Sequence, residues 1–254
     1  MIDSHCHLAS EEFRGDLSTI IDRAQETGIS TMITIGDTVQ ESAECLKIAE
    51  EYPSLFAAIG VHPHHAKNFD EARDGTWLKE HAKHPKCKAI GEIGLDYHYM
   101  NSPKSDQMSA FRCQLQLAKE LKKPAVIHTR EALDDTWKIL QEIDHHGIVI
   151  HCCTEAWNDI ERFVDRGYFL SFTGIATYAK SDVIRETIKH CPLEQMMVET
   201  DAPYLSPVPH RGKRNEPAFV KEVAQCVAEV KGVSFEEVDA VTTQNTLQFF
   251  GLLP

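Results

Sequence analysis

Eight short apolar segments alternate with amphipathic helical segments along the 254 residues of this chain. The apolar segments predict strands at 2–7, 31–36, 55–61, 88–95, 124–128, 147–151, 168–172 and 195–200. Between them, apolar side chains recur three and four positions apart, which predicts helices at 16–27, 39–52, 72–83, 105–122, 131–145, 155–166 and 181–190. Such an alternation favours a parallel sheet covered by helices.

The predicted fold is α/β, a single TIM-like (β/α)8 barrel with extra C-terminal helices in 215–250. A length of 254 residues is close to the ~250 typical of such a barrel. Because the segments follow one another without a linker rich in proline, glycine or serine, we expect one domain over 1–254. A doubly wound open sheet is the alternative, but it would gather the ends of strands one, four, five, six and eight less economically.

Three glycines, Gly28, Gly147 and Gly167, each fall just after a predicted helix. Helices commonly end with a residue in the left-handed conformation, which glycine adopts without steric cost. We therefore expect these glycines to end their helices.

Metal-type ligands stand at the polar ends of several predicted strands. His5 and His7 alternate along the first strand, so their side chains share one face and can bind one cation. The carboxyl ends of barrel strands meet at one face of the molecule, so ligands at different strand ends become neighbours. The predicted metal ligands are His5, His7, Glu92, His128, His151 and Asp201.

Four histidines and two carboxylates suffice for two divalent ions, which we expect to be Mg, Mn or Zn. Glu92 in GEIGLD is the predicted bridge, because its flanking glycines let the backbone approach a metal closely. His5, His7 and Asp201 would complete one site, and His128 and His151 the other. Imidazole-rich sites bind zinc or manganese more tightly than magnesium. The predicted catalytic residues are Glu92 and Asp201, and Asp201 would accept the proton of the attacking water.

Further residues are predicted to bind substrate at the same face. His62 and His64 end the third strand, and Arg130 follows His128 by two positions, so it points to the same mouth. A guanidinium there suits a phosphate or carboxylate. Glu199 shares the parity of Asp201, and a strand-end salt bridge is the alternative reading for it.

A basic stretch, HRGKRNE at 210–216, follows the eighth strand in a chain whose net charge is −13. Arg211 and Arg214 are predicted to clamp phosphate there, with a solvated loop as the alternative. Asp96 shares the parity of Glu92 and is predicted to fix the tautomer of a metal-binding histidine.

Seven motifs occur in order along the chain: DSHCHL, GVHPH, GEIGLDY, HTR, HC, ETDAPYL and RGKRNEP. Together they resemble the TatD-type metal-dependent deoxyribonucleases of the amidohydrolase superfamily, from Met1 to Pro254. The resemblance implies a TIM-like barrel with a binuclear site on the same six ligands. It also implies a magnesium-dependent nuclease that releases nucleotides from DNA ends. Cys153 departs from the family, which usually has an aromatic residue after HC, so this position could alter nucleotide preference.

We therefore expect a metal-dependent hydrolase, a deoxyribonuclease and exonuclease that acts on DNA or another nucleotide-containing substrate. The alternative is an ester or amide hydrolase such as an aminoacyl-tRNA deacylase or a lactonase. A non-catalytic nucleic-acid-binding protein is a third reading, but binding alone would not require six convergent metal ligands.

Charge and hydropathy limit the partners. The net charge of −13 disfavours a protein that coats duplex DNA, because affinity for DNA rises with each phosphate that is neutralised. It leaves open the cleavage of DNA ends, where metal ions and a few arginines supply positive charge. No apolar run approaches the ~18 residues of a membrane span, and no signal peptide is recognisable. We expect a cytoplasmic protein with reduced cysteines, no membrane association and no obligate protein partner.

Overall fold

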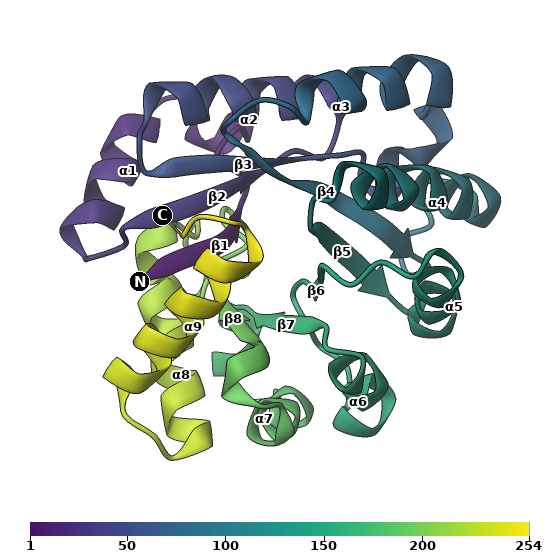
Figure 1. Cartoon of the computed structure of the whole chain (residues 1–254). Coiled ribbons are helices and arrows are strands. Elements are labelled where there is room, and N and C mark those ends of the chain that lie inside the picture. Colours follow the sequence, from purple (N-terminus) through teal and green to yellow (C-terminus); the bar gives the residue numbers. More distant parts are fainter. Residues whose placement is uncertain (254) are drawn as a thin grey trace. The chain divides into compact units, whose positions relative to one another are not determined.

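The computed structural model describes residues 1–253, and within them the strands form one sheet whose order follows the sequence from β1 to β8 (Figure 1). The strands are β1 (Ile2–Cys6), β2 (Thr31–Ile35), β3 (Leu55–Ile59), β4 (Cys87–Asp96), β5 (Ala125–Arg130), β6 (Ile148–Ile150), β7 (Phe169–Phe172) and β8 (Met196–Val198). The TIM-like (β/α)8 fold predicted from the alternation is confirmed.

Helices separate the strands, as the apolar periodicity predicts. They are α1 (Leu17–Glu26), α2 (Val39–Glu51), α3 (Thr76–His81), α4 (Lys104–Leu121), α5 (Leu133–Ile143), α6 (Trp157–Asp165), α7 (Asp182–His190), α8 (Val220–Lys231) and α9 (Phe235–Phe249). The last two are the expected extra C-terminal helices. None of the helices in residues 1–253 combines the length and the apolar character that crossing a bilayer requires.

The chain divides into two compact units, which we describe separately. One consists of Met1–Ile33 and the chain from Cys152 onward, and the other of Thr34–His151. The single domain predicted for 1–254 stays a prediction.

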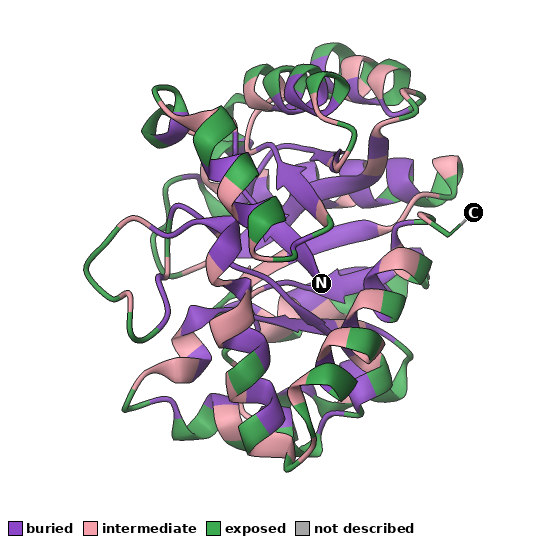
Figure 2. Ribbon diagram, turned by 90° about the vertical axis from the view of Figure 1, so that its left-hand side faces the viewer, coloured by how far each residue is buried: buried purple, intermediate pink, exposed green. Residues whose placement is uncertain are grey.

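The unit Thr34–His151 is built on the parallel strands β3 to β6. Small residues stand in register with one another or with isoleucine, as in the pairs Ala58 with Ala89 and Ala125 with Ile148. The helices α2 and α4 pack against β3 and β4. Both helices combine buried with exposed positions. The strands at the centre are largely buried (Figure 2). This burial pattern explains why the apolar periodicity predicts the elements well.

Strand β4 departs from regular pairing at the point where it carries Glu92. Its register with β5 shifts between Ile90 and Ile93, so Glu92 lies in an irregular segment inside the strand. The sequence predicts Glu92 near the strand's end, but the strand continues to Asp96. Gly94, with φ 141°, brings β4 so close to β5 that a Cβ there would lie 2.0 Å from the His128 carbonyl oxygen. Only glycine permits this approach.

In the other unit, β1 lies beside the segment that follows β8. The His7 N–H donates to the Ala202 carbonyl oxygen at 2.7 Å, and the Asp201 N–H donates to the His5 carbonyl oxygen at 2.9 Å. Strands β7 and β8 pair in parallel register, with Leu170 opposite Met196. These bonds bring the two ends of the strand sequence together.

The expectation for the three glycines is correct at Gly28 and Gly167, which have φ values of 90° and 86°. It is wrong at Gly147. Helix α5 already ends at Ile143, and Asp144 adopts the left-handed conformation with φ 53°. Aspartate tolerates that conformation better than most residues, so the helix ends four residues before the glycine.

Candidate metal centre

The first candidate cluster combines β1 with the turn after β8. His5 Nε2 and His7 Nε2 lie 3.2 Å apart. Both face Asp201 Oδ1, at 3.6 Å from His5 Nε2 and 3.2 Å from His7 Nε2. His5 is fully buried and His7 nearly so. Two imidazole nitrogens and a carboxylate oxygen that face one point form a set able to hold a metal ion.

The backbone holds Asp201 in an uncommon conformation. Its φ of 57° lies in the left-handed region, which few residues other than glycine occupy and in which aspartate is enriched. The hydrogen bond from the Asp201 N–H to the His5 carbonyl oxygen fixes this turn against β1. The carboxylate is thereby aimed at the histidines of the neighbouring strand.

Asp3, which was not among the predicted site residues, holds the backbone of this cluster in place. Its carboxyl group accepts hydrogen bonds from the Thr200 N–H at 2.9 Å, the Thr200 hydroxyl at 2.6 Å and the His5 N–H at 3.3 Å. Burial raises the pKa of Asp3 to about 8, against the hydrogen bonds from Thr200 and His5. The strand alternation that pairs His5 with His7 also includes position 3, so the sequence contained the signal.

The second candidate cluster surrounds one oxygen of Glu92. Its Oε1 lies 2.7 Å from His128 Nδ1, 2.8 Å from His151 Nε2 and 3.4 Å from His62 Nε2. Glu92, His62 and His128 also satisfy the spacing of a metal-binding group. His62, predicted to contact substrate, thus lies among the predicted ligands.

His128 bridges two carboxylates. On the side away from Glu92, His128 Nε2 lies 3.0 Å from Asp96 Oδ2, and His64 Nε2 lies 3.1 Å from the same oxygen. Asp96 therefore touches one predicted ligand and one predicted substrate residue. A carboxylate in this position fixes which histidine nitrogen faces the metal.

The electrostatics of the second cluster favour ionised carboxylates. Burial opposes charge on Glu92, but the imidazoles of His151, His62 and His128 hold its pKa well below the ordinary value. Burial likewise opposes charge on Asp96, yet hydrogen bonds from His128 and the Tyr99 N–H hold its pKa low. The acceptor oxygens are thus negatively charged, as cation ligands are.

The chemistry of both clusters fits a divalent metal ion. Imidazole nitrogen and carboxylate oxygen are the ligands of zinc and manganese sites. In the first cluster the two Nε2 atoms stand 3.2 Å apart, and two neutral imidazoles can hydrogen-bond there only if one ring carries its proton on Nε2 and the other does not. A cation between them and Asp201 would satisfy both.

Arg130 lies exposed at the end of β5. Its guanidinium carbon lies 4.7 Å from the ring centroid of Tyr99. The ring of Tyr99 in turn lies 5.4 Å from the ring of His64. Arg130 is therefore held near the second cluster through Tyr99, a residue that we did not predict.

Glu199 is buried, with 1% of its surface exposed. It accepts hydrogen bonds from the Cys152 N–H at 2.7 Å and the Ser4 hydroxyl at 3.4 Å. These hydrogen bonds hold the turn at Cys152 in place, and contact of Glu199 with substrate stays a prediction.

Cys153 is also buried, and burial raises the pKa of its thiol far above the ordinary value.

The basic loop is tied down at several points. Arg214 forms a two-pronged ion pair with Asp16, in which Nη1 lies 3.1 Å from Oδ1. The guanidinium of Arg211 lies 3.8 Å from the ring centroid of Tyr178. Asn215 donates to the Thr200 carbonyl oxygen at 2.8 Å, which fastens the loop near Asp201. Arg211 is thus the more accessible of the two predicted phosphate-binding arginines.

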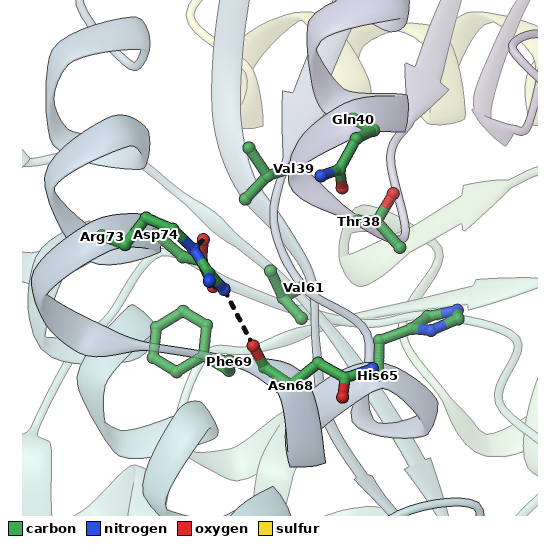
Figure 3. Close-up of a pocket in the computed structure, with 9 residues that line it drawn as sticks. All are labelled: Thr38, Val39, Gln40, Val61, His65, Asn68, Phe69, Arg73 and Asp74. Carbon is green, nitrogen blue, oxygen red and sulfur yellow. Dashed lines mark hydrogen bonds and ion pairs between the residues drawn. The ribbon is translucent and has the colours of Figure 1, made fainter.

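A cavity of about 210 Å³ lies between the segments that follow β2 and β3 (Figure 3). Its lining residues are Thr38, Val39, Gln40, Val61, His65, Asn68, Phe69, Arg73 and Asp74. The Arg73 guanidinium is bound to the Asp74 carboxylate and to the Asn68 carbonyl oxygen. The positive charge of Arg73, which an anionic ligand in this cavity would require, is thus already paired with Asp74.

Two exposed tyrosines lie next to the clusters and were not among the predicted substrate-binding residues. Tyr99 and Tyr204 are 56% and 51% exposed. The ring of Tyr204 lies 6.0 Å from that of His7. Tyr204 lies within the motif ETDAPYL and Tyr99 two residues after GEIGLDY, but a motif of ligands gives no signal for an aromatic neighbour.

Comparison with known proteins gives consistent matches over nearly the whole chain. Residues 2–251 match the family described as TatD related DNase. The chain is 38% identical to the uncharacterized metal-dependent hydrolase YabD of Bacillus subtilis, over 98% of both chains. It is 35% identical to the 3'-5' ssDNA/RNA exonuclease TatD of Erwinia amylovora, over 99% of this chain and all of that protein.

Among solved structures, the fold is similar to that of YjjV, a TatD homologue from Escherichia coli. The TM-score is 0.94 with 29% sequence identity, over 100% of this chain and 98% of the other.

Proposed function

Because this chain belongs to the TatD-related DNase family, we propose that it is a divalent-metal-dependent hydrolase that cleaves phosphodiester bonds at DNA ends. The similarity to an exonuclease of single-stranded DNA and RNA supports a nucleic acid as substrate. The cleavage of DNA ends, the number of metal ions and the identity of these ions are all parts of this proposal.

The observation that carries the proposal is the grouping of the six predicted ligands. His5, His7 and Asp201 form one cluster. Glu92, His128 and His151 form another, in which both imidazoles lie within 2.8 Å of Glu92 Oε1. Buried groups of this composition are costly unless charges are paired or a metal is bound. Two divalent ions per chain, one held by each cluster, would account for the composition of both clusters.

A bound divalent ion would lower the pKa of water and polarise a phosphoryl oxygen. The residues of the chain perform the remaining tasks. Asp201 accepts the proton of the water that attacks the phosphorus, for which its partly exposed carboxylate is suited. His5 and His7 keep that carboxylate in place.

Substrate phosphates require positive charge, which a chain of net charge −13 supplies only locally. Arg130 is exposed and lies beside Tyr99, whose ring contacts that of His64. Its planar guanidinium can bind two phosphate oxygens at once. Arg211 offers a second cation from the basic loop. A few such contacts would hold a strand end without coating a duplex.

The test is an activity screen of metal-stripped protein to which Mg, Mn or Zn is added back. Substrates are single-stranded DNA, RNA, a phosphodiester reporter and an uncharged carboxylic ester. We expect DNA to be cleaved from one end, with release of nucleotides. Arg130→Ala should slow cleavage of the phosphate-bearing substrates and leave the metal content unchanged.

The ester decides between this proposal and its alternative. If the ester is the better substrate of the unmodified protein, or if Arg130→Ala slows ester and DNA equally, the nuclease proposal fails. An ester or amide hydrolase, such as an aminoacyl-tRNA deacylase or lactonase, would then take its place. DNA binding without any hydrolysis would point to a non-catalytic protein.

A further inference from the structure

We propose that Tyr99 is a stacking platform for a nucleobase of the substrate, placed so that Arg130 binds the adjoining phosphate. The inference rests on the proposed phosphodiester substrate and names a further binding residue. Tyr99 is well exposed for an aromatic residue, with 56% of its surface accessible to solvent.

The surroundings of Tyr99 orient its ring. The rings of His64 and His98 meet it nearly at right angles, at centroid distances of 5.4 Å and 4.8 Å. The guanidinium of Arg130 lies over the ring, 4.7 Å from its centroid. A cation above an aromatic face is attracted by the ring's electrons. These contacts fix the ring while more than half of the residue remains exposed.

The backbone of Tyr99 is fixed as firmly as its ring. The N–H groups of Tyr99 and His98 donate to Asp96 Oδ1 at 2.8 Å and 3.0 Å. The other oxygen of Asp96 binds His128 and His64. One carboxylate therefore positions both the exposed ring and a predicted metal ligand, so the platform stands in a constant relation to the second cluster.

The distance from the platform to the cluster is short. Tyr99 contacts His64, whose ring lies 4.4 Å from that of His62. His62 Nε2 lies 3.4 Å from Glu92 Oε1. One pair of imidazoles thus separates the exposed ring from the carboxylate. A base next to the cleaved phosphate is the group of a nucleic acid that an aromatic ring at this place can reach.

An aromatic ring beside an arginine matches the two parts of a nucleotide. Every base offers a flat face for stacking, so the contact tolerates all sequences. The guanidinium takes the charged phosphate. A compact phosphodiester without a base would use Arg130 alone. Tyr99 would therefore favour nucleic acid over other phosphodiesters.

The experiment combines Tyr99 variants with oligonucleotides that lack one base. Single-stranded oligonucleotides with a 5′ fluorophore carry thymidine throughout, or an abasic tetrahydrofuran unit at one position near the cleaved end. We measure kcat/KM for the unmodified protein, Tyr99→Ala, Tyr99→Phe and Tyr99→Trp. The matched control is Phe56→Ala, because Phe56 also lies beneath a cation, Lys86 Nζ at 4.7 Å, but at the amino end of β3.

We expect Tyr99→Ala to lower kcat/KM on the complete oligonucleotide about tenfold, within the range measured for base–aromatic stacks. Tyr99→Phe and Tyr99→Trp should retain activity, and Phe56→Ala should behave as the unmodified protein. Removing the stacked base should cost the unmodified protein the same factor and cost Tyr99→Ala nothing more. If the two losses multiply at every position, Tyr99 does not stack on a base.

Fluorescence anisotropy with the same oligonucleotides separates this inference from the proposed function. Binding that depends on Tyr99 and on one base, but without cleavage under any metal, would refute the nuclease and keep the platform. Cleavage that is insensitive to Tyr99 would refute the platform and keep the nuclease. Absence of both binding and cleavage would refute both.

Discussion

His128 Nε2 donates a hydrogen bond of 3.0 Å to Asp96 Oδ2, while the opposite nitrogen of the same ring faces Glu92. The hydrogen bond to Asp96 leaves Nδ1 as the nitrogen that faces Glu92. It also makes the imidazole a stronger ligand for a cation. Replacing a carboxylate that hydrogen-bonds to a metal-binding histidine typically lowers metal affinity about 10- to 100-fold.

Asp96→Asn should therefore weaken metal binding about 10- to 100-fold. The neutral amide no longer stabilises the imidazole as a metal ligand. Titration of metal-stripped protein by calorimetry measures the effect, and Asp165→Asn, an exposed change at the end of α6, is the control. An unaltered metal affinity would mean that Asp96 does not act through His128.

Glu92→Gln should leave the fold intact and remove most activity, because a neutral amide binds divalent cations more weakly than a carboxylate does. Elemental analysis after gentle dialysis should find two divalent ions in the unmodified protein and fewer in the variant. Glu51→Gln, an exposed change at the end of α2, is the control. One ion per chain together with full activity would rule out the two-metal mechanism.

Asp201→Asn should lower turnover at least about 10²-fold, which is the usual worth of a general base. The amide can still contact His7 but cannot accept a proton from water. Since the loss of a ligand would have a similar effect, the metal content has to be measured with the rate. Normal turnover of the fully metallated variant contradicts the assignment.

Binding of single-stranded DNA should depend only weakly on salt. Each neutralised phosphate contributes a slope near −0.7, so two or three contacts give roughly −1.5 to −2 in a plot of log affinity against log salt. Arg211→Ala with Arg214→Ala should weaken binding and flatten the slope. Arg211→Ala alone should account for most of the change, because Arg214 is engaged by Asp16. A slope that the double variant leaves unchanged excludes the basic loop from phosphate binding.

Asp74 should give a pH-dependent contribution to stability. The hydrogen bonds from Arg73 hold the pKa of this carboxyl below its ordinary value of 3.8. The folded state therefore prefers the charged form, and the stabilisation is present above that ordinary value and lost as the pH falls through the lower folded pKa. Asp74→Asn should lower Tm by about 2–4 °C at neutral pH.

That difference in Tm should shrink as the pH falls below about 4, where the carboxyl group of the unfolded chain takes up its proton. Thermal unfolding across the acidic range measures it. A constant difference at all pH values would mean that the Asp74 charge does not contribute.

The fold, and the neighbourhood of His5 and His7, could be predicted because both depend on local patterns; that these residues bind metal stays a prediction. Periodicity reports the buried face of each element, and alternation along β1 placed His5 and His7 together. Other features depend on residues far apart in the chain. Asp3 is bonded to Thr200 and Arg214 to Asp16, and no local pattern announces such pairs. Helix α5 ends before Gly147 because Asp144 already adopts the left-handed conformation, although the predicted helix continues beyond it.

The pairing of β1 with the turn at Asp201 has a consequence for protein synthesis. His5 and His7 leave the ribosome well before Asp201, because their carboxylate partner and the backbone that holds them follow almost 200 residues later. A nascent chain therefore carries two neighbouring histidines without their carboxylate until the eighth strand has emerged. This cluster cannot assemble before the segment that follows the eighth strand has been translated, so any activity that requires it is withheld until then.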